Sequence, residues 1–302
     1  DILRLWIAST DFRSEMVASD EIFKRVSDQY RRIRNTFRFL LGNINDFDAK
    51  KDSIELDNLL ELDKWILYEL AQLQKDVKGF YESYSYHQVI QRIHNFCVNQ
   101  LGGIYLDIIK DRQYTTQQDS EIRRSAQTAM QIIVNQLVLL ISPVLSFTAE
   151  EIWQANNFLL EDADSVFLST LKNLEEFNSN LSKEDWKRLL EIKEEVNQSI
   201  EESRASGIIK GSLDASIELT IDSNDFDLIN RLASEIHFFF IVSECKIING
   251  NSLKVSISKS SAEKCVRCWH RNKSVGSSSK HPELCNRCEQ NLDGPGEDRR
   301  FA

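Results

Sequence analysis

Apolar residues recur at three- and four-residue spacings from Asp1 to about Leu174, and few glycines or prolines interrupt them. This period is typical of amphipathic helices packed into a bundle. The stretch Asp1–Ile7 already has it, and we predict further helices over these ranges: Asp20–Leu41, Leu62–Ser83, Tyr86–Lys110, Ser120–Ile141 and Phe147–Ala155. Thr148 and Glu151 have the spacing of a capping box, which we expect to open the last of these helices.

The pattern changes after a loop-like stretch over Glu161–Ser182. A charged helix is expected first, followed by a strand with a period of two, a short helix, a β-rich run and a second strand. Their predicted ranges are Lys183–Ala205, Leu213–Ile221, Asp225–Glu235, Phe238–Ile248 and Leu253–Ile257. The turn Asn249-Gly250-Asn251 is a strong signal for a hairpin between the last two.

The fold class that follows is mainly α. We expect an antiparallel helical bundle, then a small α/β domain, then a C-terminal cysteine module, with boundaries at 1–175, 176–260 and 261–302. Only 10 glycines and 3 prolines occur among 302 residues, which argues against sandwiches, barrels and enzymes built on glycine loops. No apolar run approaches the roughly 20 residues that cross a bilayer, and no signal-peptide pattern is present, so we expect a cytoplasmic protein. The first residue is Asp1 rather than an initiating Met, and we expect a fragment of a longer chain.

The net charge of −10 argues against a nucleic-acid partner until its distribution is considered. Basic residues dominate from Lys24 to Arg38 and again from Asn251 onward. On the Asp20–Leu41 helix, the periodicity places a row of basic residues opposite the apolar stripe. This basic row consists of Lys24, Arg31, Arg34 and Arg38. Such a row is either a solvated helix face or a surface that grips phosphates.

Four of the six cysteines form two Cys-x-x-Cys pairs, Cys265/Cys268 and Cys285/Cys288. Two such pairs supply four soft ligands for one tetrahedral zinc ion, and a closed four-sulfur shell leaves no position for a catalytic water. We therefore predict one structural Zn²⁺, with a redox pair or free cysteines as the alternatives. His270 and His281 lie near enough to be ligands, but four thiolates complete the site, and we expect both histidines at the surface. Cys97 and Cys245 are expected to be core thiols.

The cysteine module carries Arg267, Trp269 and His270 beside its first pair. So short a tail cannot bury a tryptophan well, so Trp269 either packs against the neighbouring domain or stacks on an unpaired base. Lys110 and Arg112 could also reach a nucleic-acid backbone. Asp107 and Asp111 beside them make an ordinary surface ion pair an equal alternative.

Several ordered segments resemble the bacterial-type isoleucyl-tRNA synthetases, which are class I aminoacyl-tRNA synthetases. The similar segments span nearly the whole chain and are Asp1–Asp11, Tyr30–Asn43 with Asp46-Phe47, Tyr105–Arg112, Ser142–Trp153 and Lys264–His270. Valyl and leucyl relatives share the Pro143–Trp153 type of segment but not the zinc tail. DNA glycosylases of the formamidopyrimidine type have a similar finger, yet they use an N-terminal proline, and Asp1 stands here instead.

The resemblance implies that residues 1–175 form an anticodon-binding bundle and that the chain holds the anticodon stem-loop of isoleucine tRNA. It implies tRNA contacts at the basic row (Lys24, Arg31, Arg34 and Arg38) and at Arg267, Trp269 and His270. The parent family joins isoleucine to tRNA with ATP; this sequence contains neither the synthetase catalytic motifs nor the editing insertion, so we expect it to be inactive alone. We expect a monomer that works with the catalytic domain of the same parent chain and not with a membrane. A free-standing zinc-ribbon nucleic-acid binder and a helical interaction scaffold are the alternatives.

Overall fold

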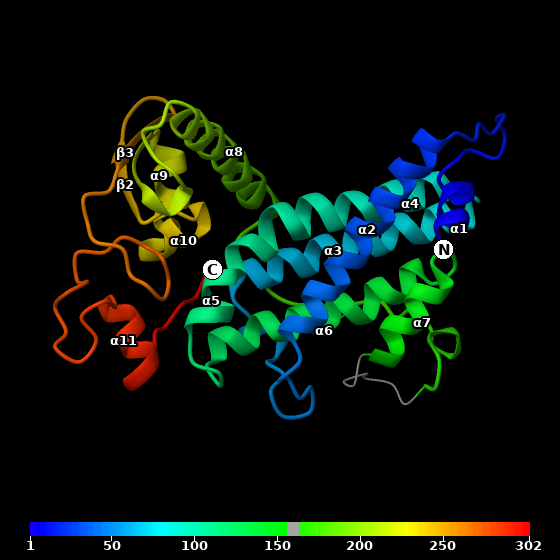
Figure 1. Ribbon diagram of the computed structural model, residues 1–302, viewed down its shortest axis with the longest axis horizontal. Coiled ribbons are helices and arrows are strands. Elements are labelled where there is room, and N and C mark those ends of the chain that lie inside the picture. The colour runs from blue at the N-terminus through cyan, green and yellow to red at the C-terminus, as the bar shows by residue number, and fades with distance from the viewer. Residues whose placement is uncertain (156–162, 175) are drawn as a thin grey trace. The chain divides into compact units, whose positions relative to one another are not determined.

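A computed structural model describes residues 1–155, 163–174 and 176–302 of the chain (Figure 1). These residues divide into two compact units, Asp1–Asp107 with Arg124–Asn178, and Ile108–Arg123 with Ser179–Ala302. Helices α5 (Leu106–Thr115) and α6 (Glu121–Ile141) contribute residues to both units. No helix in the described part of the chain is long and apolar enough to cross a membrane. The three-domain division expected from the sequence stays a prediction.

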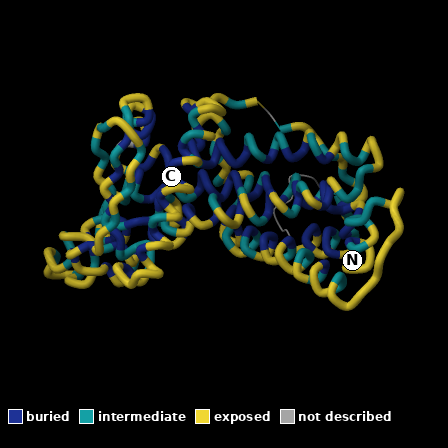
Figure 2. The backbone as a smooth tube through the Cα atoms, turned by 90° about the horizontal axis from the view of Figure 1, so that it is seen from above, coloured by how far each residue is buried: buried dark blue, intermediate teal, exposed yellow. Residues whose placement is uncertain are grey.

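The first unit is helical, as the periodicity predicted. Besides most of α6, it contains α1 (Ile2–Ala8), α2 (Asp20–Asn43), α3 (Glu61–Glu82), α4 (Tyr86–Asn95) and α7 (Ser146–Ala155). Single 3-10 turns at Leu56–Asn58 and Val166–Leu168 interrupt its connections. In Figure 2 the coils of these helices alternate between buried and exposed residues, as expected when each helix turns one apolar face inward.

Side-chain hydrogen bonds join neighbouring helices of this unit. The Gln74 side-chain N–H of α3 donates to the Gln136 side-chain oxygen of α6 at 3.2 Å. The Tyr81 hydroxyl of α3 donates to the Leu140 carbonyl of α6 at 2.9 Å. Deeper in the core, the fully buried Asp63 carboxylate accepts hydrogen bonds from the Tyr105 and Ser125 hydroxyls. Because burying a polar group without a partner costs free energy, such bonds restrict how the helices can pack.

The predicted helix over Tyr86–Lys110 is present but not regular, and the predicted capping box is wrong. The helix predicted over Tyr86–Lys110 is α4, then a π-helical stretch over Phe96–Tyr105, then α5, which continues to Thr115. The capping box at Thr148 does not form, because α7 begins earlier, at Ser146. The Asp1 carboxylate instead accepts from the Phe147 and Thr148 backbone N–H groups, and Glu151 pairs with Arg34.

The expected loop over Glu161–Ser182 lies partly outside the described residues, at 161, 162 and 175. Apart from the turn at Val166–Leu168, its described part has no helix or strand.

The second unit combines a charged helix with a small sheet. Helix α8 spans Lys183–Ala205, as predicted, and the strands are β1 (Ala215–Ile221), β2 (Glu244–Asn249) and β3 (Lys254–Lys259). Short helices complete it: α9 (Ser223–Asn230), α10 (Ile236–Phe240), α11 (Asn286–Asp293) and 3-10 turns at Ser212–Asp214 and Ala233–Glu235. The alternate residues of β1 are buried, which confirms the period of two.

The predicted hairpin is wrong, because β2 and β3 lie on opposite sides of β1 and do not pair with each other. The strand order is β2-β1-β3, with β2 parallel and β3 antiparallel to β1. Gly250 crosses the end of β1 and donates its N–H to the Ile221 carbonyl at 2.7 Å. A Cβ at Gly250 would lie only 2.4 Å from the Thr220 methyl carbon, so glycine is needed here for close approach.

The predicted β-rich run over Phe238–Ile248 is also wrong in its first part, where α10 forms instead. Phe238, Phe239 and Phe240 are all buried, so no alternation along the sequence can distinguish strand from helix here. Ile241 adopts a left-handed conformation that ends α10, and the chain then enters β2.

We predict that Asp63→Ala destabilises the helical unit. Two buried hydroxyls would lose a charged acceptor, so the free energy of unfolding should fall by about 3 kcal/mol. Urea denaturation followed by far-UV circular dichroism measures this change. Glu82→Ala, at an exposed position of the same helix, is the control. Equal midpoints for the two variants would contradict the role given to Asp63.

Candidate zinc centre and nucleic-acid interface

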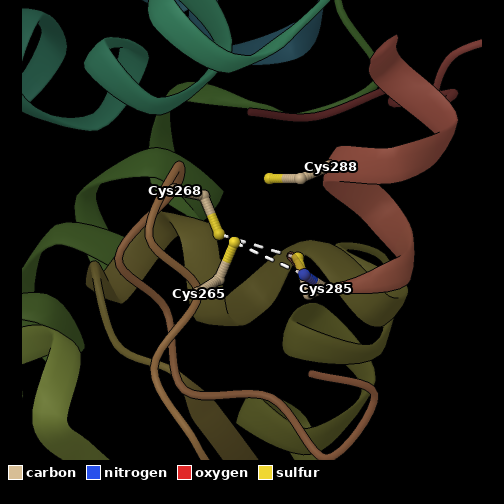
Figure 3. A group of neighbouring side chains, drawn as sticks. All are labelled: Cys265, Cys268, Cys285 and Cys288. Atoms are coloured by element: carbon tan, nitrogen blue, oxygen red, sulfur yellow. Dashed lines mark hydrogen bonds between the residues drawn. The ribbon is translucent and has the colours of Figure 1, made fainter. Parts of the chain in front are cut away.

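The four cysteines expected to bind zinc come together from two short segments (Figure 3). Cys265 and Cys268 lie in a loop that is closed by a β-bridge between Lys264 and Arg271. Cys285 is the N-cap of α11, and Cys288 lies in the first turn of that helix. This pairing of a loop with a helix start lets each Cys-x-x-Cys segment direct two sulfur atoms to one point.

The dimensions of this cluster fit a tetrahedral zinc ion. All four Sγ atoms lie within 4.8 Å of one another, and all four cysteines are buried. The Sγ atoms of Cys268 and Cys285 are 3.8 Å apart. With Zn–S bonds of about 2.3 Å, the edge of a tetrahedron is about 3.8 Å. The four thiols can therefore hold one Zn²⁺ and leave no open position.

The surroundings of the thiols also favour a cation among them. The backbone N–H of Cys285 donates to the Cys265 sulfur at 3.4 Å. Hydrogen bonds from Cys268 and Cys285, together with burial, raise the pKa of the Cys288 thiol. Four buried sulfurs thus cannot all ionise without a compensating positive charge, which zinc supplies when bound. Among the described residues, Val275 and Leu284 are the partly buried apolar neighbours of the cluster, so its apolar core is small.

The two nearby histidines do not join the cluster. His270 is buried, packs edge-on against Phe238 with ring centres 5.6 Å apart, and has its Nε2 3.6 Å from Asp111. Its predicted surface position is wrong, because other parts of the second unit cover it. His281 is half-buried and pairs with Asp293 at 2.7 Å.

Of the two cysteines expected in the core, Cys97 is buried in the first unit and Cys245 is half-buried on β2. Burial raises the pKa of each thiol to about 12.

Trp269 is exposed, in contrast to the buried histidine that follows it. Trp269 has 61% of its surface accessible to solvent, and its backbone φ is 66°. The left-handed conformation is uncommon for a bulky residue, and it turns the chain at the end of the first cysteine pair, where the Trp269 N–H donates to the Cys265 carbonyl. The Lys264 ammonium lies 5.5 Å from the ring centre. The exposed indole ring of Trp269 thus lies beside the positive charge of Lys264.

Arg267 behaves differently from its neighbour Trp269. It is half-buried, and its Nη2 donates to the Thr115 carbonyl at the end of α5, at 3.3 Å. The predicted neighbours Arg267, Trp269 and His270 therefore have three different environments.

The basic row on α2 keeps three of its four members at the surface. Lys24, Arg31 and Arg38 are exposed, and Arg31 makes an exposed ion pair with Asp28 at 2.9 Å. Arg34 is the exception, since it is half-buried and donates two hydrogen bonds to Glu151 of α7, at 2.6 and 2.7 Å. It lies only about 100° around the helix from the buried Ile33, which brings it to the edge of the neighbouring helix.

A buried ionic cluster went unrecognised in the sequence. The Asp111 carboxylate accepts two hydrogen bonds from Arg287, at 2.6 and 2.8 Å, and one from Arg299 at 2.5 Å. Glu297 binds the same two arginines. Burial alone would raise the pKa of Asp111, but the hydrogen bonds and charges of Arg287 and Arg299 hold it well below its usual value. Its partners lie 176 and 188 residues away in sequence, beyond the reach of local patterns.

The surface position considered for the charged residues between Asp107 and Arg112 is wrong for Asp111 and Arg112. Asp111 belongs to the buried cluster, and Arg112 is fully buried, with its guanidinium donating to the Ile122 carbonyl. Arg112 therefore links α5 to the first turn of α6.

We predict one zinc ion per chain and a module that unfolds without it. Binding energy of roughly 10–16 kcal/mol is folding energy for so small a module. Chelation should increase amide exchange at residues 262–291 and leave the helical circular dichroism of the first unit nearly unchanged. Cys268→Ser should abolish stoichiometric zinc in metal analysis, whereas Cys245→Ser should retain one equivalent. A global loss of helix on chelation would contradict a local role for the metal.

Comparison with known proteins gives two family matches. Residues 63–219 match the anticodon-binding domain of tRNA ligases, and residues 262–291 match the zinc finger found in FPG and IleRS. The second match agrees with the cluster geometry and supports one structural zinc.

Isoleucine–tRNA ligases are similar to the chain over its whole length. Identity is 44% with that of Teredinibacter turnerae, 46% with that of Marinomonas sp. and 44% with that of Legionella pneumophila. The chain spans about a third of the length of these relatives, between 33% and 34%. Since residues 63–219 make up more than half of the 302 residues, the chain belongs to the anticodon-binding domain family of the tRNA ligases.

Proposed function

We propose that this chain is the anticodon-binding part of an isoleucine–tRNA ligase and that it holds the anticodon stem-loop of isoleucine tRNA. The observation that carries the proposal is the full-length similarity to isoleucine–tRNA ligases, which includes both the helical family match and the zinc finger. A free-standing zinc ribbon or a helical scaffold would give no reason for such similarity across 302 residues.

The exposed cations of α2 are suited to the phosphate backbone. Lys24, Arg31 and Arg38 stand on the side of the helix opposite its buried stripe, so they reach solvent without disturbing the core. Contacts of this kind position an RNA but carry no sequence information. Because Arg34 is neutralised by Glu151, we leave it out of these contacts.

Trp269 is suited to an unpaired base. An exposed indole offers a flat apolar face, and the neighbouring Lys264 adds positive charge for a nearby phosphate. His270 is buried and Arg267 is directed at Thr115, so neither is included among the proposed base contacts. The zinc ligands would be Cys265, Cys268, Cys285 and Cys288, and their task is to hold the loop that carries Trp269.

In this proposal the attachment of isoleucine to tRNA with ATP belongs to the part of the parent protein outside this chain. The chain contributes by holding one end of the tRNA, so that the other end is delivered to the catalytic domain. We further propose that it acts as a monomer in the cytoplasm. Binding of isoleucine and non-cognate anticodon stem-loops to the 302-residue chain tests the proposal directly. Equal affinity for both would overturn it.

We predict that Arg38→Ala weakens the binding of cognate and non-cognate stem-loops alike. Loss of one phosphate contact should reduce the salt-dependence exponent by up to about one. Titrations at several salt concentrations measure both effects. Arg25→Ala is the matched control, because Arg25 is exposed on the same helix but lies about 140° around it from Arg38. An unchanged exponent for Arg38→Ala would remove this residue from the interface.

We predict a different response for Trp269→Ala. Losing one stacked base should cost on the order of 1–3 kcal/mol of binding free energy and leave the salt exponent unchanged. The effect should be confined to the isoleucine stem-loop, and Trp269→Phe, which keeps an aromatic face, should recover most of it. Zinc content is measured in each variant. If Trp269→Ala binds as tightly as the wild type with its zinc intact, base stacking by Trp269 is wrong.

A further inference from the structure

Both zinc-binding segments carry an arginine immediately before their second cysteine. The segments are Cys265-Val266-Arg267-Cys268 and Cys285-Asn286-Arg287-Cys288. In each, the residue before the arginine is exposed, whereas the arginine itself is half-buried. The backbone of each arginine is fixed by the cysteines on either side of it, so the zinc site determines where both guanidinium groups point.

Both guanidinium groups reach the same helix. Arg287 binds the Asp111 carboxylate through two hydrogen bonds, at 2.6 and 2.8 Å, and Arg267 donates to the Thr115 carbonyl at 3.3 Å. Asp111 and Thr115 are four residues apart in α5, which puts them on one face of the helix. Two arginines, one from the loop of the first cysteine pair and one from the first turn of α11, thus converge on one face of the last turns of α5.

The residues after α5 extend this contact. Gln117 donates its side-chain amide to the Gly294 carbonyl at 2.9 Å, just beyond the end of α11. Gly296 has a φ of 86°, and a Cβ there would lie 2.7 Å from the Gln117 oxygen. The polypeptide after α11 is therefore packed closely against residue 117.

Residues 299–302 also contact the Asp111 region. Arg299, with only 1% of its side chain exposed, also binds Asp111, and its guanidinium lies 3.6 Å from the centre of the Phe238 ring. The backbone N–H groups of residues 300–302 donate to the Glu235 carboxylate at 2.8 to 3.0 Å. Asp111 is thus a carboxylate of α5 that is bound both by the zinc module, through Arg287, and by the C-terminal residues, through Arg299.

We propose that Arg267 and Arg287 are positioning residues that dock the zinc module on α5, and that Asp111 is the anchoring carboxylate. The half-buried Arg287 and the buried Arg299 both bind Asp111, so removing its charge leaves their guanidinium groups without full compensation. Asp111 lies outside the zinc-binding set, so the module itself should still bind its metal. What should be lost is the fixed orientation of the module on α5.

For RNA, the consequence rests on the proposed function: a loosely docked module presents Trp269 in many orientations. Asp111→Asn should therefore lower the preference for the isoleucine stem-loop without changing the salt exponent. Amide exchange, measured without RNA, tests the docking independently of that function.

The experiment compares Asp111→Asn with Asp298→Asn, which removes an exposed carboxylate from the same unit. With zinc at saturation, both variants should retain one equivalent of metal. Exchange of backbone amides at residues 112–123 and 300–302 should accelerate on the order of tenfold or more in Asp111→Asn only. Asp111→Glu restores the charge and should recover most of the protection, and it is also the second variant if Asp111→Asn fails to fold.

The proposal fails if Asp111→Asn exchanges like Asp298→Asn, if it loses its zinc, or if Asp111→Glu is no better protected than Asp111→Asn. A different result concerns the proposed function alone. If exchange responds as expected but the wild-type chain shows no preference for the isoleucine stem-loop, the docking stands and anticodon recognition is wrong.

Discussion

The zinc module is constrained by its size: about thirty residues cannot bury enough apolar surface to fold alone. In the part of the chain that the structure describes, Val275 and Leu284 are the partly buried apolar residues packed against the cysteines. Four thiolates around one cation would replace the missing hydrophobic core, because the metal–sulfur bonds would join a loop to the start of α11. Every other feature of the module depends on this cluster, including the exposed position of Trp269 and the direction of Arg267 and Arg287.

A folded module still has to be held in place, and here the structure uses buried charge. Asp111 accepts from arginines that come from α11 and from the C-terminal residues. Buried ion pairs of this kind contribute little net stability, since desolvation offsets most of the attraction. They do penalise alternative arrangements strongly, because any displaced charge would be left buried and unpaired. Asp63 acts in the same way in the helical unit, where two hydroxyls converge on one carboxylate.

The helical unit meets a different requirement, which is to present cations without weakening its core. The amphipathic period of α2 satisfies both conditions, because burying Val26, Ile33 and Phe37 turns Lys24, Arg31 and Arg38 to solvent. The negative net charge of the chain is therefore compatible with a local phosphate-binding surface. In the proposed function, long-range attraction comes from this row and discrimination from the single aromatic face of Trp269.

The sequence by itself determined several features that depend on near neighbours: the amphipathic helices, the boundaries of α8, the alternation of β1 and the two cysteine pairs. The tertiary structure determined which residues pack against the buried face of each helix and strand. The placement of β2 and β3 around β1, the helical turn at Phe238–Phe240, the pairing of Arg34 with Glu151 and the burial of His270 and Asp111 all depend on residues distant in sequence. Periodicity along the sequence indicates which side of a helix or strand is buried. It does not indicate which other element covers that side, because this is set only when the elements pack. Whether a charged residue is exposed or forms an ion pair depends on the element that covers it.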